Sequence, residues 1–343
     1  EHRRMFLEGP RRVAEALGLH QMRDQPAVVL FDELHKYERW KDFLKGFFDT
    51  YADRARIIVS GSARLDVFNQ AGDSLTGRYF SYRMHPFSVG EWSRYVEPGV
   101  VCNTRWEALR SFGGFPEPLL KGDERFYRRW RTSRTQQLLR DELRDLSRIH
   151  DIARIEVLHT LLRERVGQLT SYSSLAGQLR VSVDTVRRWL STLAGLYQVF
   201  AVRPYWRNVP RSLRKEPKYY FWDWSIVSPG GARNENLIAS HLLKAAHLWT
   251  DLGHGDFELF FLRDKERREV DLLMTRDQEP WLLVETKTAR RGHLSGHLEY
   301  FAKRLRVPIV LQVAMDLPPV AGTCLTEGPP LIVPARTLLA ELP

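Results

Sequence analysis

Four side chains in the last third of the sequence are of the types that hold a metal ion and cleave a phosphodiester. Glu235 lies in a segment with a helical pattern, and Asp271 and Glu285 lie in two successive strand-like segments. Carboxylates are the ligands that Mg²⁺ and Mn²⁺ prefer. Lys287 follows Glu285 by two residues, so both point to one face of a strand. The set predicts Mg²⁺ (or Mn²⁺) held by Glu235, Asp271 and Glu285, with Lys287 orienting the attacking water or stabilising the phosphate.

The segments around these residues follow a fixed order. A strand is expected at 218–223 and a helix at 230–243, followed by strands at 257–263, 269–275 and 281–287, a helix at 293–305 and a strand at 308–313. From the first helix onward the order is α-β-β-β-α-β, which resembles the PD-(D/E)xK nuclease core. That core also serves as a catalytically silent nucleic-acid platform, so the order predicts a nuclease-like fold and leaves cleavage open.

A second pair of acids stands near the start of the chain. The apolar run 27–31 is typical of a buried parallel strand, and Asp32 and Glu33 follow it directly. The carboxyl ends of such strands are where α/β sheets place ligand chemistry. We expect Asp32 to orient Mg²⁺ and Glu33 to polarise the attacking water of an ATP hydrolysis. An ordinary acidic turn after a strand is the alternative.

The next strand supports the nucleotide interpretation. A helix is expected at 38–51, and the apolar run 56–59 then ends in Ser60 and Ser62. A hydroxyl beside the acidic strand can contact a γ-phosphate. Arg78, directly after a glycine, can reach phosphate charge. Asp32, Ser60, Ser62 and Arg78 are therefore the candidate nucleotide-binding residues.

The middle of the chain predicts a helix-turn-helix. Helices are expected at 152–162, 171–179 and 183–193, with a tight turn between the last two and a wing strand at 199–206. Leu179, Val186 and Leu190 are expected to face inward. The candidate DNA-binding residues on the 183–193 helix and the wing are Arg187, Arg188, Arg203 and Arg207. A scaffold for protein–protein contacts is the alternative.

The overall charge agrees with a polyanionic partner. The 343-residue chain has a formal net charge of +10, and its arginines gather between 125 and 214. Basic surfaces bind phosphate chains because binding releases counterions, although a solvated basic face has the same composition. No apolar run suits a membrane span, and the two cysteines, Cys102 and Cys324, form no metal or disulfide pattern. A reducing cytoplasm is the expected location.

The order of these motifs resembles the bacterial and archaeal AAA-type ATPases that carry the DUF4143 domain. The matching residues are Asp32-Glu33-Leu34-His35-Lys36, Ser60-Gly61-Ser62, Leu75-Thr76-Gly77-Arg78, Pro86-Phe87-Ser88 and Gly113-Gly114-Phe115-Pro116-Glu117. The resemblance implies nucleotide sites between subunits, and hence a homo-oligomer with Arg78 acting in trans. The family's GxxxxGK[ST] loop has no match, and we expect that element to precede Glu1 in the encoded protein.

The sequence therefore predicts an α/β chain of several parts. These are a partial P-loop (AAA+-like) parallel sheet at 1–98, a helical linker or lid at 99–148, an α+β winged helix at 149–216 and an α/β PD-(D/E)xK nuclease-like domain at 217–343. The expected function is an ATP-dependent motor or switch that binds or processes duplex or branched DNA. The alternatives are a nucleotide-gated DNA- or protein-binding switch without cleavage or translocation, and a toxin- or defence-associated ATPase.

Overall fold

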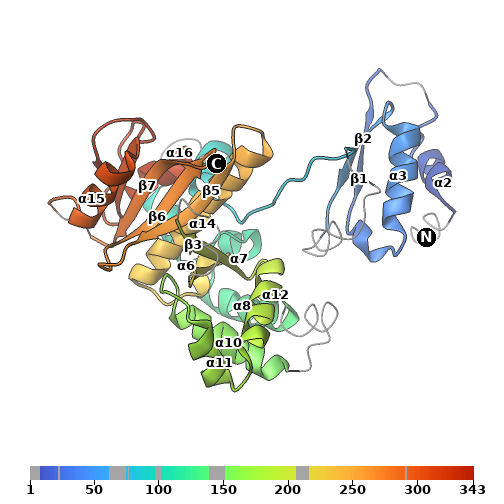
Figure 1. Cartoon of the computed structure of the whole chain (residues 1–343). Coiled ribbons are helices and arrows are strands. Elements are labelled where there is room, and N and C mark those ends of the chain that lie inside the picture. Colours follow the sequence, from blue (N-terminus) through green and yellow to red (C-terminus); the bar gives the residue numbers. More distant parts are fainter. Residues whose placement is uncertain are drawn as a thin grey trace. The chain divides into compact units, whose positions relative to one another are not determined.

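The computed structural model describes residues 8–21, 24–61, 75, 77–96, 102–138, 151–205, 216–289 and 292–343. The chain divides into two compact units, Glu1–Ser81 and Tyr82–Pro343 (Figure 1). Residues 82–96, which the sequence groups with the ATPase domain, thus fall in the second unit. Among the described helices, none has both the length and the apolar character that a membrane crossing requires.

The N-terminal unit is a small α/β arrangement. Its elements are α2 (Pro10–Ala16), β1 (Ala27–Phe31), η1 (Leu34–Lys36), α3 (Trp40–Tyr51) and β2 (Ala55–Val59). The two strands pair in parallel with Ala27 opposite Ala55. Apolar residues recur along one face of α3 at helical spacing, and Phe43 and Phe47 pack edge-on against Phe31 of β1. The parallel pairing confirms the sheet that the sequence predicts.

The second unit begins with helices. They are α5 (Val89–Glu91), η2 (Trp92–Val96), α6 (Asn103–Phe112), α7 (Pro116–Lys121), α8 (Glu124–Gln137), α10 (Ile152–Glu164), α11 (Tyr172–Leu179) and α12 (Val183–Gly195). Short polar side chains accept backbone N–H groups at the starts of several of them, including Asp123, Asp151, Ser171 and Ser182. These caps satisfy N–H groups that have no partner inside the helix, which explains why the helices start there.

A mixed sheet of seven strands forms the rest of this unit. Its strands are β3 (Val199–Pro204), β4 (Lys218–Phe221), β5 (Phe257–Arg263), β6 (Glu269–Arg276), β7 (Glu279–Lys287), β8 (Ile309–Ala314) and β9 (Leu331–Pro334), in the spatial order β4-β3-β5-β6-β7-β8-β9. The helical elements between and after them are η4 (Trp224–Ile226), α14 (Gly231–Asp251), α15 (Gly296–Leu305) and α16 (Ala335–Glu341). The expected α-β-β-β-α-β order is therefore present from α14 to β8.

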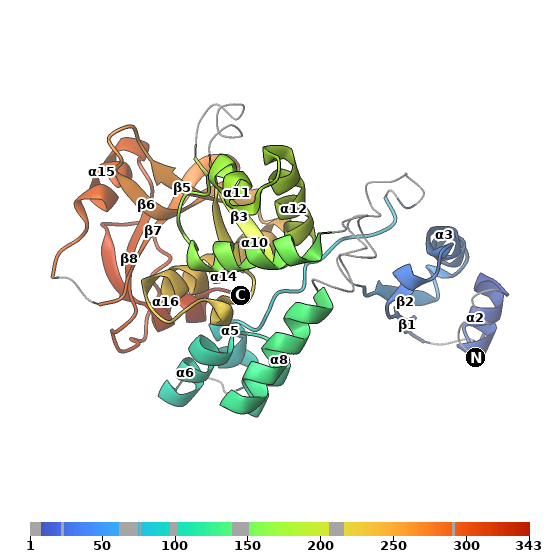
Figure 2. The same cartoon turned by 90° about the horizontal axis from the view of Figure 1, so that it is seen from below.

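The sheet lies between two helices, α14 and α15 (Figure 2). Leu298 and Phe301 of α15 share a core cluster with Leu273 of β6 and Leu283 of β7. The β5–β6–β7 meander is antiparallel, whereas β8 joins β7 in parallel through the α15 crossover. Strand β3 pairs with β4 and also with β5. The strand that the sequence assigns to a wing is thus continuous with the C-terminal sheet across the expected boundary at 216/217.

Candidate functional sites

The carboxyl ends of β1 and β2 bring Asp32 and Ser60 together. The backbone N–H of Ser60 donates to the carbonyl oxygen of Phe31 at 2.9 Å, which extends the strand pairing by one step. The Ser60 hydroxyl then donates to Oδ1 of Asp32. A carboxylate and a hydroxyl thus share one exposed edge of the sheet, as the sequence predicts. Ser62, the other hydroxyl assigned to this edge, lies outside the described residues.

Glu33 and Arg78 have partners of their own. Glu33 adopts a left-handed backbone conformation, with φ of 52°, and its carboxylate contacts Nζ of Lys36 at 2.8 Å. Nε of Arg78 contacts Oδ1 of Asp49 at 2.8 Å. Asp49 lies in the last turn of α3, which runs back from the carboxyl end of β1 to the start of β2. Arg78 is therefore held toward the end of the strands that is remote from Asp32.

Helices α11 and α12 form the expected pair joined by a tight turn. Arg180 closes α11 in a left-handed conformation, and the Ser182 hydroxyl caps α12 by accepting the Thr185 N–H at 3.1 Å. Leu179 and the α12 residues Val186, Trp189 and Leu190 are buried, while Arg187 and Arg188 are exposed. The predicted inward and outward faces of α12 are therefore confirmed.

The arginines of this region differ in what surrounds them. Arg187 lies 3.6 Å from the exposed carboxylate of Asp184 and 5.5 Å from the centre of the Tyr172 ring. Contacts of this kind between exposed side chains contribute little stability and leave the guanidinium available to a partner. Arg203 is exposed on β3. Arg207 lies outside the described residues.

The C-terminal acids are gathered around a buried lysine that the sequence analysis overlooks. Nζ of Lys218, at the start of β4, lies 2.7 Å from Oε1 of Glu269 and 3.4 Å from Oε1 of Glu235. The Tyr220 hydroxyl donates to the same oxygen of Glu235 at 2.6 Å. Burial opposes the charge of Lys218, but Glu235, Asp271 and Glu269 outweigh it and raise the pKa of Lys218. The surrounding carboxylates therefore favour the charged form of this lysine.

Asp271 lies beside this group on β6. Its Oδ2 accepts the backbone N–H of Thr286 from β7 at 2.8 Å. Burial and the neighbouring charge of Glu235 raise the pKa of Asp271 to about 7, although Lys218 acts in the opposite direction. A carboxyl group of this kind exchanges its proton near neutral pH.

Glu285 and Lys287 of β7 contact each other directly, as their strand phase predicts. The second carboxylate oxygen of Glu285 is buried without a hydrogen-bond partner. Within the described parts of the chain, however, no three His, Cys, Asp or Glu side chains are close enough to hold a metal ion. The structure therefore brings the four predicted residues to one region but does not assemble Glu235, Asp271 and Glu285 into a metal centre.

Sequence reasoning missed Lys218, Tyr220 and Glu269. A signal for Glu269 was present, because it precedes Asp271 by two residues on the same strand and so shares its face. Lys218 opens a strand that is buried at every position. A lysine in such a strand needs an anionic partner, which the sequence could have suggested.

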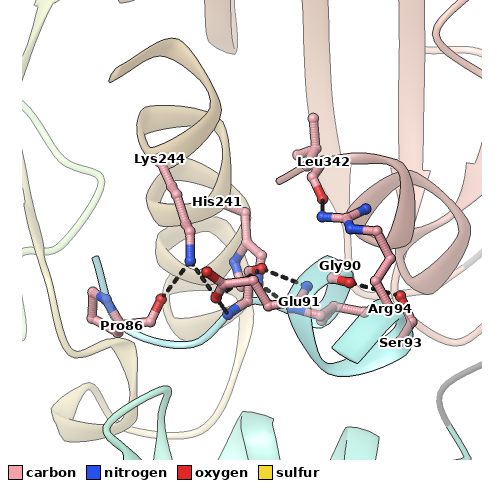
Figure 3. Close-up of polar contacts among 10 residues, drawn as sticks. Pro86, Gly90, Glu91, Ser93, Arg94, His241, Lys244 and Leu342 are labelled. Carbon is pink, nitrogen blue, oxygen red and sulfur yellow. Dashed lines mark hydrogen bonds and ion pairs between the residues drawn. The ribbon is translucent and has the colours of Figure 1, made fainter. Parts of the chain in front are cut away.

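The Pro86-Phe87-Ser88 motif is held by the second unit (Figure 3). Ser88 and Glu91 form a reciprocal capping box at the start of α5. Nζ of Lys244, on α14, donates to the carbonyl oxygen of Pro86 at 3.1 Å and contacts the Glu91 carboxylate. The Val89 N–H donates to Nε2 of His241 at 3.1 Å. These contacts give the motif a structural role.

Comparisons with known proteins agree with the N-terminal part of this arrangement. Residues 2–93 match the family described as an AAA domain. Residues 103–229 match a "Domain of unknown function (DUF8612)". The first match supports an AAA-type ATPase, and with it the use of a nucleotide and, as is usual for such ATPases, Mg²⁺. The second corrects the expected DUF4143 assignment, since the helices and first strands of the second unit match a different family.

Two curated mycobacterial proteins are similar to this chain. They are "Uncharacterized protein Mb2031c" of Mycobacterium bovis and "Uncharacterized protein Rv2008c" of Mycobacterium tuberculosis, each 25% identical over 261 residues. The alignments cover 74% of this chain and 57% of each relative, so the chain spans little more than half of their length. No solved structure matches the chain.

Proposed function

We propose that this chain is part of an ATP-dependent DNA-binding protein, in which an AAA-type ATPase controls how a helix-turn-helix holds duplex or branched DNA. The observation that carries the DNA part is the orientation of α12. Its apolar residues are buried and Arg187 and Arg188 face outward. Exposed arginines on the second helix of such a pair are positioned to contact phosphates.

The edge formed by Asp32 and Ser60 suits the ATPase role. An exposed carboxylate beside a hydroxyl provides the oxygen ligands that Mg²⁺ takes in proteins. Asp32 would hold the ion there, and a bound Mg²⁺ would neutralise charge on the phosphates. Glu33, the next residue along the chain, would orient the attacking water. Arg78, held away from Asp32 by Asp49, would serve a neighbouring copy in a homo-oligomer.

The C-terminal region is proposed as a platform that holds DNA without cutting it. Glu235, a carboxylate that would hold Mg²⁺ in a nuclease, already faces Lys218 here, and Glu235, Asp271 and Glu285 are not close enough to one another to share an ion. These residues do not fit a metal in this arrangement. This observation favours the switch over a nuclease.

The test is ATP turnover by the full-length protein with and without duplex DNA, together with DNA affinity at several salt concentrations. We expect DNA to change the rate of turnover, and the affinity to fall steeply as salt rises. Turnover that is indifferent to DNA, together with no measurable DNA affinity, would contradict the proposal. A four-way junction in place of the duplex then asks whether branched DNA is preferred.

A further inference from the structure

The carboxylates around Asp271 contain their own cation. The side chain of Lys218 is only 2% exposed, and its ammonium lies within 3.4 Å of both Glu235 and Glu269. It also lies 5.2 Å from the centre of the Phe261 ring, which closes another side. An ammonium so enclosed has exchanged water for carboxylates, and its removal would take a positive charge away from both of them.

The remaining contacts use the oxygens that a metal would need. Oε1 of Glu235 accepts from both Lys218 and the Tyr220 hydroxyl. Oδ2 of Asp271 accepts the Thr286 N–H at 2.8 Å. Oε1 of Glu269 faces Lys218. Each of these acids therefore has at least one oxygen committed to a donor from the protein.

The charges of the region are nearly balanced. Its acids are Glu235, Glu269, Asp271 and Glu285, and its cations are Lys218, Arg263 and Lys287. With Asp271 ionised, four negative charges face three positive ones and leave a single excess negative charge, whereas with Asp271 protonated the charges balance. A divalent ion placed here would approach the Lys218 ammonium at close range, and like charges in a buried site repel strongly.

We propose that Lys218 is the resident cation of this cluster, occupying the place among Glu235, Glu269 and Asp271 where a divalent ion would otherwise bind. Because Lys218 supplies the positive charge, the acids are held together without Mg²⁺ or Mn²⁺. The inference rests on the contacts of the cluster and is independent of ATP hydrolysis and DNA binding.

The experiment is a titration of the full-length protein with Mn²⁺, in which binding is measured by calorimetry and by the paramagnetic resonance of the free ion. We expect Lys218→Met to bind Mn²⁺ tighter than the wild type by about tenfold or more, the scale on which one charge at about 4–6 Å shifts a carboxyl equilibrium. Adding Asp271→Asn to that variant should abolish the gain, which assigns the new ion to the cluster. Lys303→Met, which removes an exposed lysine from α15, is the control for net charge and should behave as the wild type.

A second variant keeps the test decisive if Lys218→Met does not fold. Lys218→Met/Glu269→Gln removes one cation and one anion, so it preserves the charge balance while vacating the centre of the cluster. We expect it also to gain Mn²⁺ affinity. The proposal is wrong if a folded variant of either kind binds no more Mn²⁺ than the wild type. It is equally wrong if the wild type binds one Mn²⁺ that Asp271→Asn removes.

Discussion

The ammonium group of Lys244 contacts the carboxylate of Glu91, and this ion pair ties the chain after Ser81 to α14 (Figure 3). The lysine is largely buried, with 10% of its side chain exposed, while Glu91 is 33% exposed. The same ammonium also donates to the carbonyl oxygen of Pro86. The Lys244 side chain thus holds both Glu91 of the capping box and Pro86, the first residue of the Pro86-Phe87-Ser88 motif.

Replacing Lys244 by methionine should destabilise the second unit. The change leaves Glu91 and the Pro86 carbonyl without their cationic donor, and breaking a partly buried pair of this kind costs about 2–4 kcal/mol. Urea unfolding followed by tryptophan fluorescence measures the loss. Lys303→Met, at an exposed position on α15, should change the unfolding free energy far less. Equal unfolding midpoints for the two variants would show that the contact does not anchor the segment.

The local elements were largely predictable from the sequence. Strands at 257–263 and 269–275 and the helix-turn-helix at 171–193 follow from the apolar periodicity of the sequence. In the structure, Ser171 and Ser182, of a residue type that is preferred at helix starts, cap the two helices of the pair. Such signals depend on neighbours in the chain. That is why the exposed positions of Arg187 and Arg188 could be read before the structure was known.

Relationships between distant segments could not be predicted in the same way. The residues of Val199–Pro204 do not themselves show that β3 pairs with β5 as well as β4. Strand pairing depends on which strand edges of the sheet are still unpaired as the chain folds. The contact of Lys218 with Glu269 likewise joins residues 51 positions apart by way of that sheet. Sequence reasoning therefore found the acids and missed the cation that neutralises them.

Glu33→Gln should still bind ATP but lose turnover by about 10²-fold or more, the usual scale for losing a general base. Glutamine keeps the size of the side chain, and its amide can remain near Lys36, which now contacts the carboxylate at 2.8 Å. The measurement is phosphate release by the full-length protein, with nucleotide binding determined separately. Glu38→Gln, an exposed position on the same segment, is the matched control. Unchanged hydrolysis by Glu33→Gln would remove this residue from the mechanism.

Replacing Arg187 and Arg188 by alanine should weaken duplex DNA binding with little dependence on sequence. Each lost phosphate contact should flatten the slope of log affinity against log salt by about 0.9. Fluorescence anisotropy at several salt concentrations measures both quantities. Lys303→Ala/Arg304→Ala, which removes the same two charges from exposed positions on α15, should retain the wild-type slope. A double variant with the wild-type slope would favour the protein–protein scaffold instead.

Asp271 should make the stability of the second unit depend on pH. Its pKa is raised to about 7 in the folded chain, mainly by burial and by Glu235, whereas an unfolded aspartate titrates near about 3.9. Between these values the folded state binds a proton that the unfolded state releases. The stabilising contribution is therefore fully present below about pH 4 and is lost as pH rises through about 7.

Asparagine cannot ionise but can still accept the Thr286 N–H, so Asp271→Asn should remove this dependence while keeping the contact that Oδ2 makes at 2.8 Å. Between pH 5 and pH 8, the unfolding free energy of the variant should rise relative to that of the wild type by roughly 1–3 kcal/mol. This range follows because one pKa unit corresponds to about 1.4 kcal/mol and because Asp271 is only partly exposed, so solvent screens little of its charge. Urea unfolding at intervals across that range gives both curves. Glu258→Gln, an exposed carboxyl of the same sheet, should run parallel to the wild type. If the curve of unfolding free energy against pH for Asp271→Asn also runs parallel to that of the wild type, Asp271 does not hold the proton. Another acid of the cluster must then carry it and set the charge balance around Lys218.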